Sequence, residues 1–499
     1  MMTYSIHILD SFGIIIIGVL LEKSLFLIQE KKTMSESVVG NLKLSRYIIP
    51  FYYEGNYSET CEKISLRWEL RKPTEAEQDI YEYVADSLYS TERSISESEN
   101  DIGSLWIPKK KSGLKFPKLL YVDQASNIDY KIYSHEVGIS IFRNGIGFVW
   151  YDISLRNRDA TFVTDTDVII GFQNKFKELN RKSNVSRIKL EGSEEPFVLG
   201  EWIDKMLLAD FLCKRFYPGR KHCISSEYPS KVPDKALLYT YYIVFDSIDT
   251  REITELIFRL SSGYDTKYRL SNSIMDHSFI PFDNVVWKIT KEGCGCCVNT
   301  DEKDSFFTRL FVDKVKNDYF TLYLLLLYQS YSLLMYAEKI ELKMSANPDF
   351  YLSNKDDSKI QKLLAEMNTF TMKSTHTSVS HIQHQNDFYE YGMQRLRIKE
   401  DADSVIAGAE SLGEMQKLVE EKEKEKNDSV INTALALLSV WAFFSAISDG
   451  VASVNWLFFD ENLFTNPTYS IASIIMATIV CGVGIFALIY IIVGKKKQK

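Results

Sequence analysis

Residues 430–447 read VINTALALLSVWAFFSAI, residues 469–493 read YSIASIIMATIVCGVGIFALIYIIV, and neither stretch contains a charged residue. Each is long enough to cross the hydrocarbon core of a membrane, which needs about 20 helical residues. Helices buried in a protein core can have the same composition, but two such stretches in tandem favour membrane spans. The sequence therefore predicts an integral membrane protein with transmembrane helices at residues 430–448 and 469–494.

Charged residues lie unevenly around these two stretches. Residues 421–428 (EKEKEKND) precede the first stretch, and residues 495–499 (KKKQK) form a basic tail after the second. The connection between the stretches, residues 449–468, contains no Lys or Arg. The positive-inside rule makes this connection an external loop and puts both chain ends in the cytoplasm. We therefore expect a multi-pass protein of the inner or cell membrane.

The remaining chain is polar enough to fold outside the membrane. Charged residues make up 25% of the 499 residues, and the net charge is -8. This acidic balance gives no reason to expect direct nucleic-acid binding, so an anionic ligand would need a local basic pocket. Residues 1–33 are an uncertain extension, because Met34 offers an alternative start. The apolar run at residues 12–21 is too short for a span and predicts a strand or a short helix.

Residues 34–304 are expected to form a cytoplasmic α/β domain. Two β-rich runs within residues 139–153 are separated by Asn144 and Gly145, which is the pattern of a hairpin. Alternation and helical periodicity predict the other elements. These are strands at residues 237–245 and 285–289, helices at residues 199–216 and 250–260, and surface loops at residues 91–103 and 108–118.

Residues 305–429 are expected to form a helical stalk region. Its first part contains a third uncharged stretch, residues 319–336 (YFTLYLLLLYQSYSLLMY). Hydropathy alone would make this stretch a span, but it contains Gln329, Ser330 and Ser332 and lies between charged segments. An extra span would also place the folded body and the C-terminus on opposite sides of the membrane. The sequence therefore favours a helix that is buried in the cytoplasmic assembly.

The most regular stretch of the chain follows a second expected helix at residues 358–370. Because no proline occurs between residues 387 and 427, one unbroken helix is predicted to run into the first span. Its apolar stripe needs a packing partner, and one pair of spans cannot enclose a pore, so we expect a homo-oligomer. The stripe recurs at steps of three, four or seven positions and consists of Phe388, Tyr391, Ile398, Ala402, Val405, Ala409, Leu412 and Val419.

An α/β cytoplasmic domain, a long helical stalk leading into a two-helix transmembrane domain, a short external loop and a basic tail resemble the CorA-like divalent-cation channel superfamily. The resemblance covers the architecture of the whole chain and the sequence character from about residue 387 onward. It implies a homopentamer, a pore lined by the first span, and a basic ring around the cytoplasmic mouth of this pore. By position, the ring consists of Lys495, Lys496, Lys497 and Lys499.

One departure from the family pattern concerns the transported ion. Members that transport magnesium carry Gly-Met-Asn at the end of the first span, whereas residues 448–455 read SDGVASVN here. The resemblance therefore implies a divalent cation, with Mg²⁺ as one candidate, whereas the missing motif removes the basis for expecting selectivity for magnesium. Divergent members without this signature also resemble membrane effectors of type III CRISPR antiviral defence, in which a nucleotide second messenger binds the cytoplasmic body.

The first span has one face of small and polar residues. Such a face suits either a pore or close helix packing, and the architecture favours a pore. The predicted pore-lining residues are Asn432, Ala436, Ser439, Phe443, Ala446 and Gly450. Acidic residues at the predicted external mouth, which would attract cations in general, are Asp449, Asp460 and Glu461.

Residues 214–222 (KRFYPGRKH) combine cations with aromatic residues around a turn. These residue types hold phosphates and stack on bases, so this run is the best candidate for a ligand site. The alternative is an exposed helix end whose basic residues complement the helix dipole. The ligand-binding candidates are Lys214, Arg215, Tyr217, Arg220 and Lys221.

The sequence predicts neither a metal site nor an enzyme. Cys294, Cys296 and Cys297 lack the usual spacing of zinc ligands and are expected to lie in a loop. His381 and His384 are one helical turn apart, but no further ligand accompanies them in a recognisable pattern. No phosphate-binding glycine loop, nucleophile elbow or metalloprotease motif is present, so catalysis is not expected.

Three interpretations of function remain open at this point. The first is an oligomeric channel or membrane effector that is gated by a ligand bound to the cytoplasmic domain, with a nucleotide as the candidate ligand. The second is a constitutive transporter of Mg²⁺ or another divalent cation. The third is a membrane tether without transport. The sequence names neither the ion nor the gating ligand.

Overall fold

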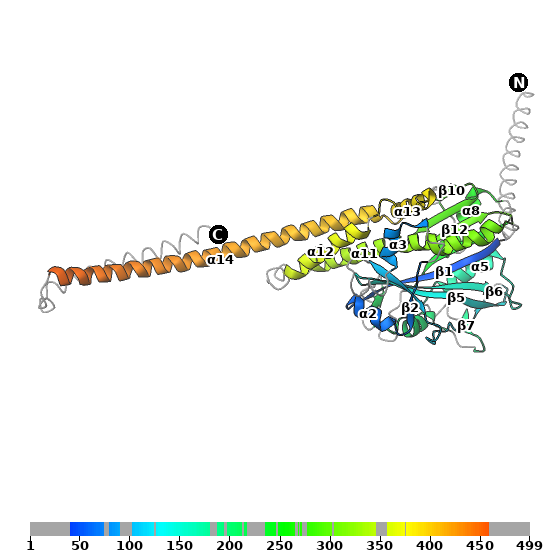
Figure 1. Ribbon diagram of the computed structural model, residues 1–499, viewed down its shortest axis with the longest axis horizontal. Coiled ribbons are helices and arrows are strands. Elements are labelled where there is room, and N and C mark those ends of the chain that lie inside the picture. Colours follow the sequence, from blue (N-terminus) through cyan, green and yellow to red (C-terminus); the bar gives the residue numbers. More distant parts are fainter. Residues whose placement is uncertain are drawn as a thin grey trace, which may run out of the picture. The chain divides into compact units, whose positions relative to one another are not determined.

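The computed structural model describes most of the chain between residues 40 and 458 (Figure 1). The described ranges are residues 40–73, 79–89, 102–123, 126–179, 187–193, 197–211, 214–216, 235–245, 248–264, 268, 270–271, 277–301, 304–345, 357–374 and 376–458. The expected extension at residues 1–33, the second span and the basic tail lie outside these ranges. The chain forms two compact units, one of Met1–Lys343 with Gln361–Ala409 and one of Met344–Ile360 with Glu410–Lys499.

A mixed sheet with the strand order β10-β11-β12-β9-β1-β6-β5-β3-β2 is the centre of the first unit. Neighbouring strands are antiparallel except for β12 and β9, which are parallel. Three short strands lie off this path, because β4 pairs with β5 and β7, and β8 pairs with β1. The strands are β1 (Gly40–Tyr53), β2 (Trp68–Leu70), β3 (Gly103–Pro108), β4 (Leu119–Val122), β5 (Asp129–Phe142), β6 (Ile146–Arg156), β7 (Ile188–Leu190), β8 (Lys214–Phe216), β9 (Leu237–Val244), β10 (Phe279–Phe282), β11 (Val285–Thr290) and β12 (Gly293–Asn299).

The predicted hairpin is confirmed by β5 and β6, which pair antiparallel on either side of Asn144 and Gly145. Gly145 adopts a φ of 91°, a backbone conformation that glycine tolerates without a steric penalty. The expected strands at residues 237–245 and 285–289 are confirmed by β9 and β11. Together these strands belong to a mixed, mostly antiparallel sheet, in the region where the sequence predicted an α/β body.

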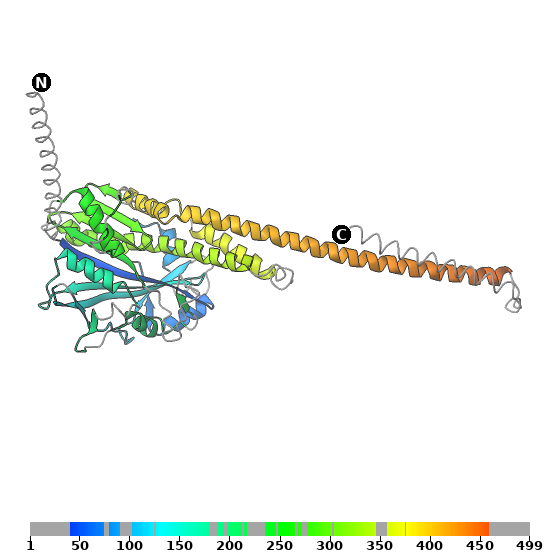
Figure 2. The same cartoon turned by 180° about the vertical axis from the view of Figure 1, so that it is seen from behind.

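Helices cover both faces of the sheet (Figures 1 and 2). Alternate residues of β9 point to opposite faces, as the period of a strand requires. The Tyr242 hydroxyl lies 2.8 Å from the Thr166 hydroxyl of α5 on one face. On the other face, the Tyr239 ring lies 5.5 Å from the Tyr323 ring of α11. Helices of this unit include α2 (Tyr57–Ile64), α3 (Glu82–Leu88), α5 (Thr166–Phe176), α7 (Leu199–Trp202), α8 (Thr250–Ser262) and α11 (Phe320–Ser345).

The expected helix at residues 250–260 is confirmed by α8, which has a clear signal at each end. The Asp249 side chain caps its first turn by accepting a hydrogen bond of 2.7 Å from the backbone N–H of Glu252. Gly263 ends the helix with a φ of 62°. An acidic N-cap and a left-handed glycine are the two signals that the sequence can supply directly.

The third uncharged stretch is a buried helix, as the sequence favoured. It begins in a helical run of η3 (Phe306–Leu310), α10 (Phe311–Lys314) and η4 (Val315–Tyr319), which leads directly into α11. Rings of α11 pack on the sheet: Tyr328 stacks on Phe142 with ring centres 4.1 Å apart, and Phe320 meets Trp150 edge to face at 5.4 Å. This helical run therefore belongs to the same unit as the sheet.

The prediction of one unbroken stalk helix from residue 387 is wrong. The helix α13 (Gln383–Arg395) ends before Arg397, whose φ of 57° is left-handed, and α14 (Ile398–Phe458) begins immediately after it. A left-handed residue costs only about 1–2 kcal/mol, which burial of the flanking Leu396 and Ile398 offsets. The absence of proline therefore does not guarantee continuity.

Two further expectations for helices have opposite outcomes. The helix expected at residues 358–370 is confirmed by α12 (Asp357–Ser374). The helix expected at residues 199–216 is wrong in its second half, because α7 and the short π-helix η2 (Ile203–Leu207) end at Leu207. Residues 214–216 instead form β8, since pairing with the edge of β1 satisfies their backbone groups.

Candidate functional site

Two helices in the described part of the chain are long and apolar enough to cross a membrane, Phe306–Glu341 and Lys424–Ser445. They differ in burial, because 78% of the most apolar window of the first is buried and none of the second is. The exposed apolar segment lies within α14, a single helix of 61 residues. This segment supports membrane association of the chain and is the first candidate site.

Apolar side chains cover most of the circumference of α14 in this segment. A helix that packs on one protein surface shows a single apolar stripe, whereas a helix that is apolar all round needs an apolar environment. The large side chains that are more than half exposed here are Val430, Ile431, Leu435, Leu437, Leu438, Trp441 and Phe443.

Two hydroxyl groups in this segment form hydrogen bonds within the helix. The Thr433 hydroxyl donates to the Ser429 carbonyl at 2.7 Å, and the Ser439 hydroxyl donates to the Leu435 carbonyl at 2.8 Å. Side chains that bond to the backbone one turn earlier need no water. The segment can therefore enter a hydrocarbon environment without leaving these donors unpaired.

The predicted pore-lining residues all lie on α14, on one face by helical geometry. Asn432 and Ser439 are exposed, and Phe443 is 60% exposed. Ala446, Gly450 and the predicted mouth residue Asp449 lie within the helix, but their side chains are not described. The helix continues to Phe458, ten residues beyond the expected end of the span at 448. Asp460, Glu461 and the basic ring lie outside the described residues.

A groove at a gap in the sheet is the second candidate site. One edge of β5 pairs with β6, and the opposite edge pairs with β4 at residues 129–132 and with β3 at residues 139–142. Among the described residues, no strand pairs with residues 133–138 on that second edge. The groove at this gap has a volume of about 830 Å³, within the range of roughly 300–1,000 Å³ that is usual for small-ligand sites.

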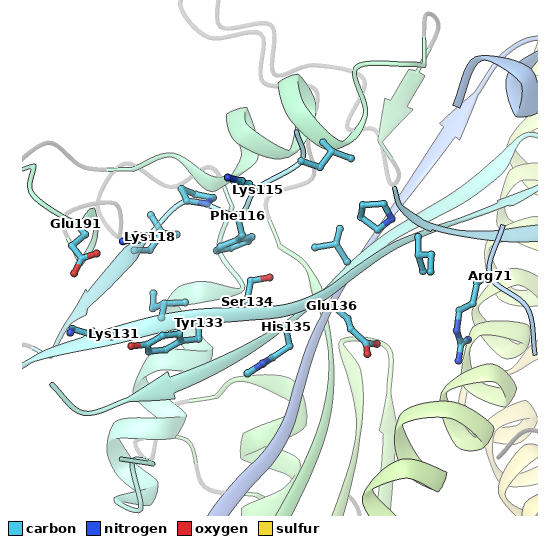
Figure 3. Close-up of a pocket in the computed structure, with 17 residues that line it drawn as sticks. Arg71, Lys115, Phe116, Lys118, Lys131, Tyr133, Ser134, His135, Glu136 and Glu191 are labelled. Carbon is cyan, nitrogen blue, oxygen red and sulfur yellow. The ribbon is translucent and has the colours of Figure 1, made fainter. Parts of the chain in front are cut away.

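Two different segments form the sides of this groove (Figure 3). One is the connection that leads into β4, and the other is the unpaired part of β5. Arg71 and Glu191 lie at opposite ends of the groove in this view. The labelled residues of the two segments are Lys115, Phe116 and Lys118 on the connection and Lys131, Tyr133, Ser134, His135 and Glu136 on β5.

Positive charge predominates in the groove. The side chains of Lys115, Lys118 and Lys131 have no ion-pair partner among the described residues. Of the two acidic lining residues, Glu136 is already neutralised, because Lys316 Nζ lies 2.6 Å from its Oε1 and Arg46 lies 3.9 Å away. A ligand of negative charge is therefore favoured.

The groove contacts the helical layer through a β-bulge. The register between β5 and β6 shifts between Ser134 and Val137, which puts His135 and Glu136 in the bulge. Burial alone would raise the pKa of Glu136, but its hydrogen bond to Lys316 and the nearby charges hold this pKa below its ordinary value. Partial burial lowers the pKa of His135, so its ring is mainly neutral at neutral pH.

A buried ion pair lies directly behind the bulge. Arg46 of β1 makes a bidentate contact with Asp152 of β6, at 2.6 and 2.9 Å. The guanidinium group lies between two rings, with its carbon 4.1 Å from the centre of Trp150 and 3.9 Å from that of Phe320. It also donates to the Lys316 carbonyl at 3.1 Å. This ion pair therefore ties the sheet to the start of the helical run.

The ligand-binding run predicted at residues 214–221 is described only in part. Lys214 and Arg215 lie in β8, opposite Tyr53 and Tyr52 of β1. This is a strand, so the alternative of an exposed helix end does not apply to these two residues. Their side chains are not described, and Tyr217, Arg220 and Lys221 lie outside the described residues.

The expectation that the cysteines lie in a loop is wrong. Cys294, Cys296 and Cys297 lie in β12 and are fully buried between β9 and β11. Burial raises the pKa of all three thiols, which leaves them protonated and unreactive. The segment GCGCCV forms a strand. Its small side chains let the helices approach the sheet closely.

The described residues contain no group of three or more potential metal ligands. Of the two histidines considered as ligands, His384 has a structural contact, because its Nδ1 lies 2.8 Å from the Tyr319 hydroxyl. The His381 ring packs 4.2 Å from Tyr81. These contacts join α13 and the segment before it to the rest of the first unit.

Sequence reasoning missed the groove. It assigned Lys115 and Lys118 to a solvated loop and did not single out the middle of β5. The available signal was the polar run Tyr133-Ser134-His135-Glu136, which interrupts an otherwise alternating strand of 14 residues. A polar break inside a long strand marks a bulge or a gap in pairing, both of which are frequent beside functional sites.

Comparison with known proteins gives no relative: no protein-family model, curated protein or solved structure matches this chain.

Proposed function

We propose that this chain is one subunit of an oligomeric, CorA-like membrane channel or membrane effector, gated by a ligand that binds the cytoplasmic α/β body. The observation that carries the proposal is the continuity of α14. Val405 and Ala409, near its start, are buried in the first unit, and the same helix contains the apolar segment at residues 430–445, none of which is buried. A rigid helix of this kind can carry a change in the body to the membrane.

The proposed topology has two spans, an external loop and cytoplasmic chain ends. It is supported by the charged residues at 421–428, which lie on α14 directly before the apolar segment. A membrane-impermeant thiol reagent added to intact cells is expected to label an Asn462→Cys variant and to leave a Gln498→Cys variant unlabelled. Both variants are made in a chain without Cys481, which is the cysteine of the second proposed span. The opposite labelling pattern would contradict this topology.

Conduction is proposed to occur along the face of α14 that contains Asn432, Ser439 and Phe443. Without Gly-Met-Asn at the outer mouth, such a pore would select poorly among cations, so it must rest closed to preserve the membrane potential. The Phe443 ring can close it by excluding water, and the lysines of the tail oppose cations at the inner mouth. A ligand opens the pore if it binds the open body more tightly.

Ion flux from liposomes tests the proposal directly. Purified protein is reconstituted into vesicles loaded with a cation-sensitive dye, and dye response is recorded for Mg²⁺, K⁺ and Na⁺. We expect little flux from the resting protein and cation flux of low selectivity when Phe443 is replaced by Ala. Magnesium-selective flux without any ligand would favour the constitutive transporter instead. No flux from either protein would favour a membrane tether.

In this proposal, the gating ligand binds the run predicted at residues 214–221. If it binds a nucleotide, the double replacement Arg215→Ala with Arg220→Ala is expected to abolish ligand-dependent toxicity in cells. The assembly state, measured by the mass of the detergent-solubilised oligomer, should be unchanged. A monomeric mass for the unaltered protein would contradict the oligomer, and with it the pore.

A further inference from the structure

We infer that the groove beside β5 is a binding site for a small organic phosphate that carries an aromatic ring. The inference starts from the construction of the groove. The backbone of residues 133–138 lacks a neighbouring strand on one edge, among the described residues, which leaves peptide N–H and C=O groups available to a ligand. A gap of this kind inside a twelve-stranded sheet is a built feature and not an outer edge.

The charge of the groove selects an anion. Lys115, Lys118 and Lys131 approach the groove from two different segments, so a ligand between them would meet cations on both sides (Figure 3). None of the three has an ion-pair partner among the described residues. Ammonium groups on both sides of a ligand can bind phosphate oxygens, and here they outnumber Glu191, the lining carboxylate that has no cationic partner described above.

The rings of the groove select an aromatic group. Tyr133 is 40% exposed beside the lysines, and its phenol can stack on a ring of the ligand. Phe116 is held in place on the opposite side, because its ring packs 4.8 Å from Trp202 and 5.9 Å from Tyr151. The volume of about 830 Å³ holds a ring and one or two phosphates.

A ligand in this groove would affect the helices on the neighbouring face of the sheet. Two lining residues contact the π-helical turn η4, where Lys316 Nζ lies 2.6 Å from Glu136 and Asn317 Oδ1 accepts from Arg71 at 2.9 Å. This turn continues directly into α11. An anion in the groove would compete with Asn317 for Arg71, which would weaken one of these two contacts with η4. The gating consequence rests on the proposed function, whereas the binding site does not.

Calorimetric titration of the full-length protein in detergent at low salt tests the site. The probes are ADP, pyrophosphate, adenosine and glycerol 3-phosphate, the last of which represents the headgroup of a phospholipid. We expect ADP to bind about 10-fold more tightly than glycerol 3-phosphate, from the stacking of one ring. Adenosine should not bind measurably. Equal binding of ADP and glycerol 3-phosphate would overturn the assignment and favour a lipid headgroup.

Matched variants locate the bound probe. The double replacement Lys118→Gln with Lys131→Gln should weaken ADP at least about 10-fold, since it removes two charged hydrogen-bond donors. The control Lys110→Gln with Lys111→Gln removes the same charge from the same connection outside the groove, and should leave affinity unchanged. Tyr133→Ala should weaken ADP and leave pyrophosphate unaffected.

Ligand binding and ion conduction can fail independently of each other. If ADP binds as stated and the protein conducts nothing in liposomes, the assignment of the groove as a ligand site is supported and the proposed channel function is contradicted. If ADP does not bind, or the groove variant binds it as tightly as the control variant, the inference is overturned whatever the flux. Loss of ADP binding in the Arg215→Ala, Arg220→Ala variant alone would overturn it as well and would place the site at β8.

Discussion

The helices α11 and α14 both contain segments apolar enough to cross a membrane, yet the segment of α11 is mostly buried and that of α14 is not. The polar side chains of α11 make long-range hydrogen bonds, because Gln329 donates to Tyr389 at 2.6 Å and Asn144 donates to Ser332 at 2.8 Å. Those of α14 bond to their own backbone, as Thr433 and Ser439 do. Hydropathy alone therefore does not separate these two helices, whereas their burial and the partners of their polar groups do.

The largest expected effect comes from placing a charge in each helix. Leu326→Asp buries a carboxylate between α11 and Gly392 of α13, where Leu326 lies against that glycine. We expect a loss of more than about 4 kcal/mol in the free energy of unfolding, because a buried unpaired charge is among the costliest changes. Thermal unfolding followed by circular dichroism measures it.

Leu437→Asp in α14 is the matched control, since this side chain is 52% exposed. It should leave the unfolding of the first unit unchanged and reduce recovery of the protein in the membrane fraction. If Leu437→Asp destabilised the folded body as much as Leu326→Asp, the distinction between the two helices would be lost.

A second effect concerns the ion pair that joins the sheet to the start of the helical run. Asp152→Ala leaves the Arg46 guanidinium buried without its carboxylate partner, with 2% of its side chain exposed. We expect a loss of about 3–5 kcal/mol. Asp129→Ala removes an exposed partner of Arg158 and should cost less than about 1 kcal/mol. Similar midpoints in urea for the two variants would contradict a structural role of the buried pair.

A third prediction concerns the exposed helix alone. Phe443→Ala removes the ring proposed to close the pore, so we expect expression of this variant to stop cell growth. Trp441→Ala removes a ring from nearly the opposite face of α14 by helical geometry, and cells that express it should grow normally. Normal growth with Phe443→Ala, with the protein verified in the membrane, would remove the support for a closed pore.

The smallest expected effect is a dependence on pH near the groove. The folded-state pKa of Glu136 lies below its ordinary value of 4.5, so its contribution to stability is complete above pH 4.5 and is lost as the pH falls through the lower folded pKa. Glu136→Gln should therefore be slightly less stable than the unaltered protein at pH 7 and match it at low pH. Melting temperatures of the two proteins over pH 3–7 measure this effect. A stability difference that grows as the pH falls would contradict the predicted direction.

Local sequence signals predicted the elements that end in recognisable turn or capping residues. The hairpin followed from Asn144 and Gly145, and α8 from its periodicity, with caps at Asp249 and Gly263. Two elements without such signals were mispredicted. The cysteines were assigned to a loop because their spacing suited no metal, and β8 was assigned to a helix because its strand character comes from pairing with β1.

The sequence by itself determined that a polar, charged body is joined to apolar C-terminal segments, since charge and hydropathy depend only on composition and order along the chain. It also favoured burial of residues 319–336 from their polar side chains. Only the tertiary structure decided that the helix breaks at Arg397 and that the sheet has a gap beside β5. Both depend on contacts between residues far apart in the chain, whose energies outweigh local preference.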